Sequence, residues 1–458
     1  MKHTLALVAT LILSPLPALH AGELKLAAIF SDHMVLQRGE AVPVWGWADA
    51  SAAVTVEFAG QRKTAAADAG GKWSVKLDAM AACDTGRELV VTCAGQSVKR
   101  ADILVGEVWL ASGQSNMGWA LQRTPVTAAL IPKETDALLR LGRLPHAFAE
   151  EPQADLKSCR WIACSPDEAA SFSAVAYVFA RELRKSLKVP VGVLLNSMPS
   201  STAQAWTSRE ALEREPSLAS YLTKRSKAAA ADDMKAVRSP TAACLLYNAR
   251  IAPLMPFAMR GVIWYQAEGN NGDPAGYEEL FPAMIQSWRA GWSRPEWPFL
   301  FVQLPPFKGT SPEMREAQSR CSAKVPHTAM VVTLDVGEAE QIHPANKEPV
   351  GIRLALKARA LVYGERVEHS GPVFQSAKPD GASIVAAFEH ADALKAGDGE
   401  VRGFEVAGDD GRFFTAQAVI EGGSIRLRSK SVGAPTKVRY AWSNVPDANL
   451  VNSAGLPA

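Results

Sequence analysis

The stretch ILVGEVWLASGQSNM, residues 103–117, predicts the fold class of this chain. It begins with an apolar run and ends in a glycine turn, which is typical of a strand buried on both faces. Similar runs occur at 191–196, 261–265, 299–304 and 329–334. Helical patterns lie between them, the clearest over 175–187, where apolar residues recur every four positions. This alternation predicts an α/β fold with a doubly wound parallel sheet.

The regions on either side show a different pattern. Short alternating runs such as AVTVEFAG and KWSVKL precede residue 103, and SIVAAFEH and KVRYAW follow residue 364. Strands separated by turns in this way predict small antiparallel sandwiches. We therefore expect a β-sandwich at 22–102, an α/β domain at 103–364 and a second β-sandwich at 365–458. The stretch 208–240, rich in alanine and charge, predicts an exposed helical insertion.

Composition and charge exclude some functions. Of 458 residues, 48% are apolar, enough for ordinary cores, so disorder is excluded as the main state. The 49 basic and 47 acidic side chains leave a net charge of +2, with no surplus to neutralise a phosphate backbone. We therefore expect no nucleic-acid partner.

The first residues match a secretory signal. Met1 to Ala21 has a basic start, an apolar run over 5–13, prolines and small residues near its end. The apolar run is too short to span a bilayer, so no membrane span is expected. The predicted protein is secreted or periplasmic, and export makes disulfides possible. Six cysteines are present, and the sequence leaves open both their pairing and whether they are free thiols: Cys83, Cys93, Cys159, Cys164, Cys244 and Cys321.

A serine follows the first buried strand at the expected catalytic edge of the sheet. Ser115 comes after a glycine turn and starts a predicted helix, where free backbone N–H groups can hold an oxyanion. A serine nucleophile needs a base, usually histidine. His343 lies in the loop after the last predicted parallel strand, at the same edge. We expect these two side chains to meet.

A second polar group follows the strand at 261–265. Gln266, Glu268 and Asn270 lie there. An amide at a strand end can donate to an oxyanion, and a carboxylate can orient an imidazole. Turn chemistry would also explain these residue types.

Several blocks resemble the sialate O-acetylesterase family, SGNH-type serine esterases related to the acetylxylan esterases. They are GQSNM at 113–117, LYNARIAPLMPFAMRGVIWYQAEGN at 246–270, REAQ at 315–318 and IHPANKEPVGIRLA at 342–355. The ends of the chain, 23–48 and 437–458, also resemble this family's flanking regions. The resemblance implies an SGNH-hydrolase-like sheet with flanking sandwiches, Ser115 as nucleophile and His343 as base. It implies no metal or organic cofactor.

The third catalytic member is open at this stage. Glu268 matches the glutamate of the family's YQGES/N block, which implies that it holds the histidine. Glu340 lies three residues before His343, the position of the acid in SGNH enzymes more broadly. We prefer Glu268, with Glu340 as the alternative, and a dyad without an acid is a third possibility.

The chain departs from the family pattern near the expected oxyanion site. Pro199 and Ser200 stand where the family has Gly-Gly, and Ala267 replaces the glycine of YQGES. We expect the Ser115 N–H, with Gln266 or Asn270, to hold the oxyanion, and the Ser200 N–H to contribute if the turn keeps its shape. Gln114 and Asn116 belong to the same expected site.

The expected function is hydrolysis of O-acetyl esters on carbohydrates. Of twelve tryptophans, Trp119 and Trp206 map near the catalytic edge as candidate sugar platforms. Three alternatives follow from the altered turn and the unknown substrate: a non-catalytic glycan-binding protein with a degenerate oxyanion hole, an acetylxylan esterase, and an esterase for small non-sugar esters. The sequence leaves the sugar, the acetylated position and the oligomeric state open.

Overall fold

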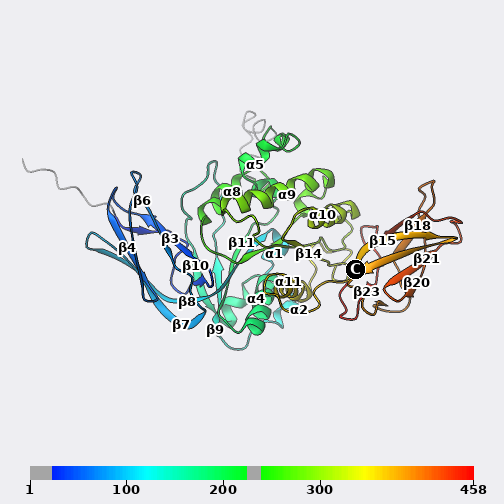
Figure 1. The fold of residues 1–458 in the computed structure, drawn as a ribbon, viewed down its shortest axis with the longest axis horizontal. Helices are drawn as coiled ribbons and strands as arrows, with labels where there is room; N and C mark the ends of the chain where they lie inside the picture. Colours follow the sequence, from blue (N-terminus) through cyan, green and yellow to red (C-terminus); the bar gives the residue numbers. More distant parts are fainter. Residues whose placement is uncertain (1–22, 224–238) are drawn as a thin grey trace, which may run out of the picture.

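The computed structural model describes residues 23–223 and 239–458, which form three regions in a row (Figure 1). The N-terminal strands lie at one end, the mixed α/β region in the middle and the C-terminal strands at the other end. The predicted signal segment 1–21 lies outside the described residues, as does 224–238 of the predicted helical insertion. The described start of that insertion contains helix α5, Arg209–Arg214.

A parallel sheet forms the central region, as predicted. Its parallel strands are β8 (Gln96–Gly113), β9 (Asp136–Arg143), β11 (Val191–Ser197), β12 (Gly261–Tyr265), β13 (Phe299–Val302) and β14 (Thr328–Val331). Strand β10 (Arg160–Cys164) pairs antiparallel with β9 at one edge. Strands β9 and β10 were not predicted from the sequence. Arg140 and Arg143 interrupt the apolar pattern of β9.

The strand order brings the end of β8 to a topological switch point. The sheet runs β10-β9-β11-β8-β12-β13-β14. When β9 and β10 are set aside, the remaining strands have the order 2-1-3-4-5. Strand β11 lies on one side of β8, and the next strand in the chain, β12, lies on the other side. Ligand sites of open parallel sheets lie at such points, beyond the carboxyl ends of the strands.

Helices cover both faces of this sheet (Figure 1). Helices α4 (Ala174–Leu187) and α11 (Glu348–Leu361) pack against each other on one face, and α9 (Pro274–Gly291) and α10 (Pro312–Lys324) on the other. Successive residues of β12 enter opposite cores, Trp264 on the α9 side and Tyr265 on the α4 side. Shorter helices are α1 (Ser115–Gly118), α2 (Pro125–Ala128), α3 (Pro166–Ala170) and α8 (Leu245–Arg250).

The N-terminal strands share β8 with the central sheet. Sheet β1-β3-β6 is antiparallel, and β5, β4, β7 and the first part of β8 form a second antiparallel ladder. The strands are β1 (Lys25–Leu26), β2 (Val35–Gln37), β3 (Val42–Trp47), β4 (Ala53–Phe58), β5 (Gln61–Ala66), β6 (Lys72–Leu77) and β7 (Cys83–Cys93). The predicted boundary at 102 therefore falls inside one continuous strand.

The C-terminal strands form a separate core. Sheet β15-β16-β21-β20 and the smaller sheets β19-β18-β22 and β17-β23 contribute to it. The strands are β15 (Val373–Asp380), β16 (Ser383–Glu389), β17 (Lys395–Ala396), β18 (Phe404–Ala407), β19 (Phe414–Thr415), β20 (Gln417–Glu421), β21 (Ser424–Arg428), β22 (Lys437–Tyr440) and β23 (Leu450–Val451). Classification of both flanking regions as sandwiches stays a prediction.

The described part of the chain also shows the state of the cysteines and the length of its apolar helices. Cys83, Cys93, Cys159, Cys164 and Cys321 are free thiols, and all of these but Cys83 are buried. No helix within 23–223 or 239–458 is long and apolar enough to cross a membrane.

Candidate active site

Ser115 is the first residue of helix α1 and lies directly beyond the switch point at the end of β8. The close approach of β8 to β12 before Ser115 depends on Gly113, whose φ is +133°. A Cβ atom at this position would lie 2.2 Å from the carbonyl oxygen of Tyr265. Glycine therefore lets β8 turn sharply while it still contacts β12. The N–H of Ser115 has no partner within the helix, since the first N–H groups of any helix have none.

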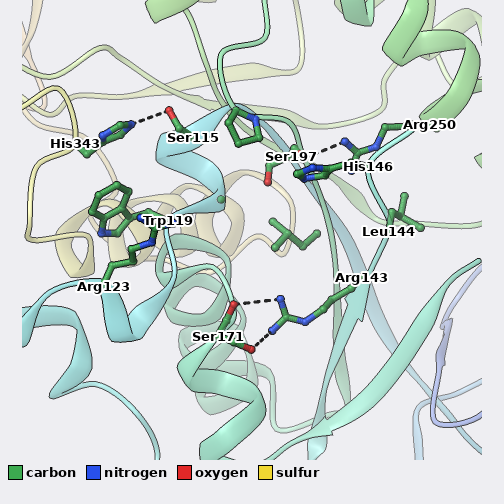
Figure 2. A pocket seen from close by; sticks show the side chains of 13 residues that line it. Ser115, Trp119, Arg123, Arg143, Leu144, His146, Ser171, Ser197, Arg250 and His343 are labelled. Carbon is green, nitrogen blue, oxygen red and sulfur yellow. Dashed lines mark hydrogen bonds between the residues drawn. The ribbon is translucent and has the colours of Figure 1, made fainter. Parts of the chain in front are cut away.

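Ser115 and His343 meet, as expected (Figure 2). The Oγ of Ser115 lies 2.8 Å from Nε2 of His343. The indole ring of Trp119 stacks on the imidazole, with centroids 4.6 Å apart and planes 24° apart. Partial burial lowers the pKa of His343, and the charges of Lys347 and Arg123 lower it further. The imidazole is therefore neutral at pH 7 and able to accept the serine proton.

A pocket of about 440 Å³ opens beside this pair. Figure 2 shows Ser115 and His343 on one side of it and Arg250 and His146 across from them. The other lining residues are Gly118, Trp119, Arg123, Arg143, Leu144, Ser171, Leu195, Ser197 and Pro199. The ends of β8, β9 and β11 thus supply the walls, as the position of the switch point requires.

Glu268 does not contact His343, contrary to our preferred assignment. It lies partly buried in the turn η4 (Glu268–Asn270), and its Oε1 accepts a hydrogen bond from Nδ2 of Asn116 at 2.5 Å. The same Nδ2 donates to the carbonyl oxygen of Ile342 at 3.0 Å. Asn116 therefore links Glu268 to the backbone of the loop that carries His343, and it does not line the pocket.

Lys347 completes this buried cluster. Its Nζ donates to Oδ1 of Asn116, so the amide lies between an amine and a carboxyl group. Burial lowers the pKa of Lys347 to about 7, and burial raises the pKa of Glu268. Both groups are shifted toward their neutral forms, which is the expected effect of desolvation.

Glu340, the alternative acid, is also misplaced for that role. Its side chain is 71% exposed and pairs with Nζ of Lys308 at 2.5 Å. Within the described residues, neither predicted acid bonds to the imidazole, so the observed contact is that of a Ser–His dyad. Sequence spacing failed here because the loop before His343 directs position 340 outward.

The predicted oxyanion amides are used for internal bonds. Gln266 is buried and donates to the carbonyl oxygen of Ser201 at 3.1 Å and to Oδ1 of Asn270 at 2.9 Å. Asn270 also accepts from the N–H of Ala203 and donates to Gln204. Neither side chain lines the pocket, so both brace the 201–204 segment. Gln114 is likewise buried and accepts from the N–H of Gly269.

The altered turn keeps a conformation that favours glycine. The N–H of Ser201 donates to the carbonyl oxygen of Met198, which closes a β-turn with Pro199 and Ser200 at its centre. Ser200 has φ +58°, and the third residue of a type II turn requires a positive φ. Ala267 has φ +156°, also unfavourable for a residue with a Cβ atom. The two substitutions are therefore accommodated at the cost of local backbone strain.

Of the two candidate platforms, only Trp119 lies at the site. Trp206 is fully buried in the 3₁₀ turn η2 (Ala203–Trp206), packs against Trp264 and Trp288 and donates to Ser201 Oγ. It is a core residue, and the prediction of a sugar platform there is wrong.

Sequence reasoning missed most of the pocket's cationic wall. His146 was predicted to be structural or solvated, and no role was given to Arg123, Arg143 or Arg250 of this wall. Lys347, in the buried cluster with Asn116, was also given no role. The position of Arg250 inside a resembled block, four residues from its start, was the only available signal.

Comparisons with known proteins agree with this architecture. Residues 105–359 match the family model described as carbohydrate esterase, sialic acid-specific acetylesterase. The sialate O-acetylesterases of rat and human are 28% and 29% identical, over 76% of this chain and 76% and 73% of their own lengths. The crystal structure of a carbohydrate acetylesterase from Xanthomonas citri is 41% identical, with a TM-score of 0.87 over 95% of this chain and 98% of that one.

The fold, the site and these similarities define an esterase enzyme. The family match covers more than half of the residues and includes both Ser115 and His343. The chain belongs to the sialic acid-specific acetylesterase family of carbohydrate esterases.

Proposed function

We propose that this enzyme removes O-acetyl groups from a carbohydrate through an acetyl-enzyme on Ser115. The 2.8 Å contact between Ser115 Oγ and His343 Nε2 at the mouth of the pocket carries the proposal. The strand order 2-1-3-4-5 supports assignment of the core to the SGNH hydrolases. The relatives' names support an acetylated sugar as substrate, with acetylated sialic acid as the first candidate. Acetylated xylan, which the sequence resemblance suggests, is the second.

The reaction proceeds in two halves. His343 Nε2 takes the proton of Ser115 as Oγ attacks the acetyl carbonyl carbon, and the negative charge moves to the carbonyl oxygen. The protonated imidazole then gives its proton to the departing sugar oxygen, which leaves an acetyl ester on Ser115. Water attacks this ester with His343 again as base and releases acetate. No step requires a metal or an organic cofactor.

The oxyanion needs preorganised donors. The backbone N–H of Ser115 is available at the start of α1, and the N–H of Ser200 lies in the neighbouring turn, beside the pocket residue Pro199. We assign these two N–H groups as donors, in place of the side chains of Gln266 and Asn270. The positive φ of Ser200, a conformation that glycine adopts readily, supports this assignment.

Acetate release from 9-O-acetyl-N-acetylneuraminic acid, acetylated xylan and p-nitrophenyl acetate tests the proposal. Ser115→Ala and His343→Ala are each expected to lower kcat by about 10⁴-fold or more. Ser287→Ala, a helix serine on α9, serves as the matched control. Full activity of Ser115→Ala would overturn the mechanism. Labelling of Ser115 by a fluorophosphonate separates it from the non-catalytic alternative, in which glycan binds and no label is incorporated.

Export is part of the same proposal. The signal-like segment 1–21 supports a secreted or periplasmic enzyme. Expression of the full chain in a Gram-negative host is expected to give an extracytoplasmic product whose first residue lies near Gly22. A product that retains Met1 in the cytoplasm would contradict this expectation.

A further inference from the structure

Arg250 is an unusual component of the pocket wall. It is the last residue of helix α8, is 1% exposed, and lines the same pocket as Ser115 (Figure 2). Its Nη1 donates to the carbonyl oxygen of Ser197 at 3.0 Å, and its guanidinium lies 5.6 Å from the ring centre of Trp206. These are neutral partners, so the charge itself is not balanced.

The remaining donors of Arg250 lack a protein acceptor. Its Nε is buried and has no hydrogen-bond partner among the described residues. No carboxylate there is close enough to pair with it, and burial lowers the pKa of Arg250 to about 9. A buried charge without a counter-ion costs several kcal/mol. A protein that keeps such a group in the wall of a binding pocket holds it ready for an anionic ligand.

The rest of the pocket also favours an anion. None of its 13 lining residues is acidic, whereas Arg123, Arg143 and His146 add basic groups. Arg143 uses both Nη atoms on Ser171 and on the carbonyl oxygen of Glu168, and it has a fixed position over Phe172. Burial lowers the pKa of His146, and the charge of Arg250 lowers it further, so His146 is neutral at pH 7. Arg123 also carries a charge, but it is exposed to solvent. Among the described lining residues, Arg250 is thus the buried group with both a charge and an unused donor.

We propose that Arg250 binds a carboxylate of the acetylated sugar and selects acidic sugars over neutral ones. The proposal rests on the esterase function proposed above. It requires the substrate to place its acetyl ester at Ser115 and its carboxylate across the pocket. Since the carboxylate does not change during the reaction, it contributes equally to the bound substrate and the transition state, and its removal raises KM more than it lowers kcat.

A matched pair of substrates tests this on the wild-type enzyme. They are 9-O-acetyl-N-acetylneuraminic acid and its carboxylate methyl ester, which differ only in the charge. The acid is expected to have a kcat/KM about 10- to 100-fold higher, the effect of one charged hydrogen bond. A ratio near 1 overturns the proposal even if no variant can be made. Absence of acetate release from every substrate would instead overturn the esterase function.

Variants assign the effect to a residue. Arg250→Met is expected to bring the acid-to-ester ratio close to 1, and the ratio does not depend on how much of the variant is folded. Arg315→Met is the matched control, because Arg315 is also buried, with its pKa lowered by burial to about 10, but it bonds to backbone carbonyls beside the C-terminal strands. An unchanged ratio in Arg250→Met would show that another group binds the carboxylate.

The product acetate is a second source of carboxylate. Inhibition by sodium acetate therefore forms a further arm of the experiment. Selection of the acid over its methyl ester, lost in Arg250→Met, supports a sugar carboxylate at Arg250. Competitive inhibition by acetate that is lost in Arg250→Met, combined with a wild-type ratio near 1, would assign Arg250 to product binding and reject substrate selection.

Discussion

Asn116 bonds at the same time to the carboxylate of Glu268 and to the backbone of the His343 loop, through Nδ2 at 2.5 Å from Glu268 Oε1 and 3.0 Å from Ile342 O. Its neighbour in the chain, Ser115, is the proposed nucleophile. The residue that follows Ile342 is the proposed base. Asn116 therefore fixes the distance between the two halves of the dyad, and Glu268 acts on His343 only through it.

Neutralising Glu268 tests whether that action is indirect. Glu268→Gln leaves an oxygen able to accept from Asn116 and removes only the charge, so we expect kcat to fall by about tenfold. If a carboxylate bonds directly to the catalytic imidazole, its replacement by an amide lowers kcat by about 10⁴-fold. Steady-state kinetics with p-nitrophenyl acetate distinguish the two. Glu340→Gln is the control and should behave as the wild type, because Glu340 is exposed and bonded to Lys308.

The pH profile of kcat/KM should report the neutral form of His343. Its pKa is held below the usual 6.5, so activity is expected to fall only as the pH drops below that value. Arg123 is exposed and its charge contributes to the lowering. Arg123→Gln should therefore move the acidic limb to higher pH, and high salt should do the same to the wild type by screening. An unmoved limb, or one that moves equally in Arg209→Gln on α5, would contradict this.

Trp119 is expected to position the base. Its ring stacks on His343, while the imidazole has no carboxylate partner among the described residues. Trp119→Ala should lower kcat by about 100-fold through misplacement of the imidazole. Trp119→Phe keeps an aromatic face and should recover most of that loss. Equal losses in both variants would mean that the indole serves the substrate and not the histidine.

Relief of backbone strain should stabilise the protein. Ala267 adopts φ +156°, and its methyl group is buried. Ala267→Gly is expected to raise the free energy of unfolding by about 0.5 kcal/mol, which is the strain removed less the entropy that glycine adds to the unfolded chain and the lost packing of one methyl group. Urea unfolding measures the change. Ala53→Gly in the regular strand β4 should have the opposite effect, a loss of about 0.5–1 kcal/mol. A loss in Ala267→Gly as large as that in Ala53→Gly would show that the turn is not strained.

The sequence determined the parts of this protein that local pattern controls. Buried apolar runs predicted five parallel strands and the helices between them, because burial on both faces requires such runs. The position of residues after strand ends predicted that Ser115 and His343 would meet, because parallel strands end at one edge of a sheet.

The tertiary structure alone decided which other side chains face the site. The sequence correctly placed Glu268 at the sheet edge and Glu340 in the loop before His343. Side-chain direction in loops has no periodicity, however, and Glu268 bonds to Asn116 while Glu340 pairs with Lys308. The same reason hid Arg250, whose charge is isolated only because α8 packs its end against β11 and Trp206. Sequence thus located the proposed nucleophile and base, whereas long-range packing set the charge of the pocket beside them.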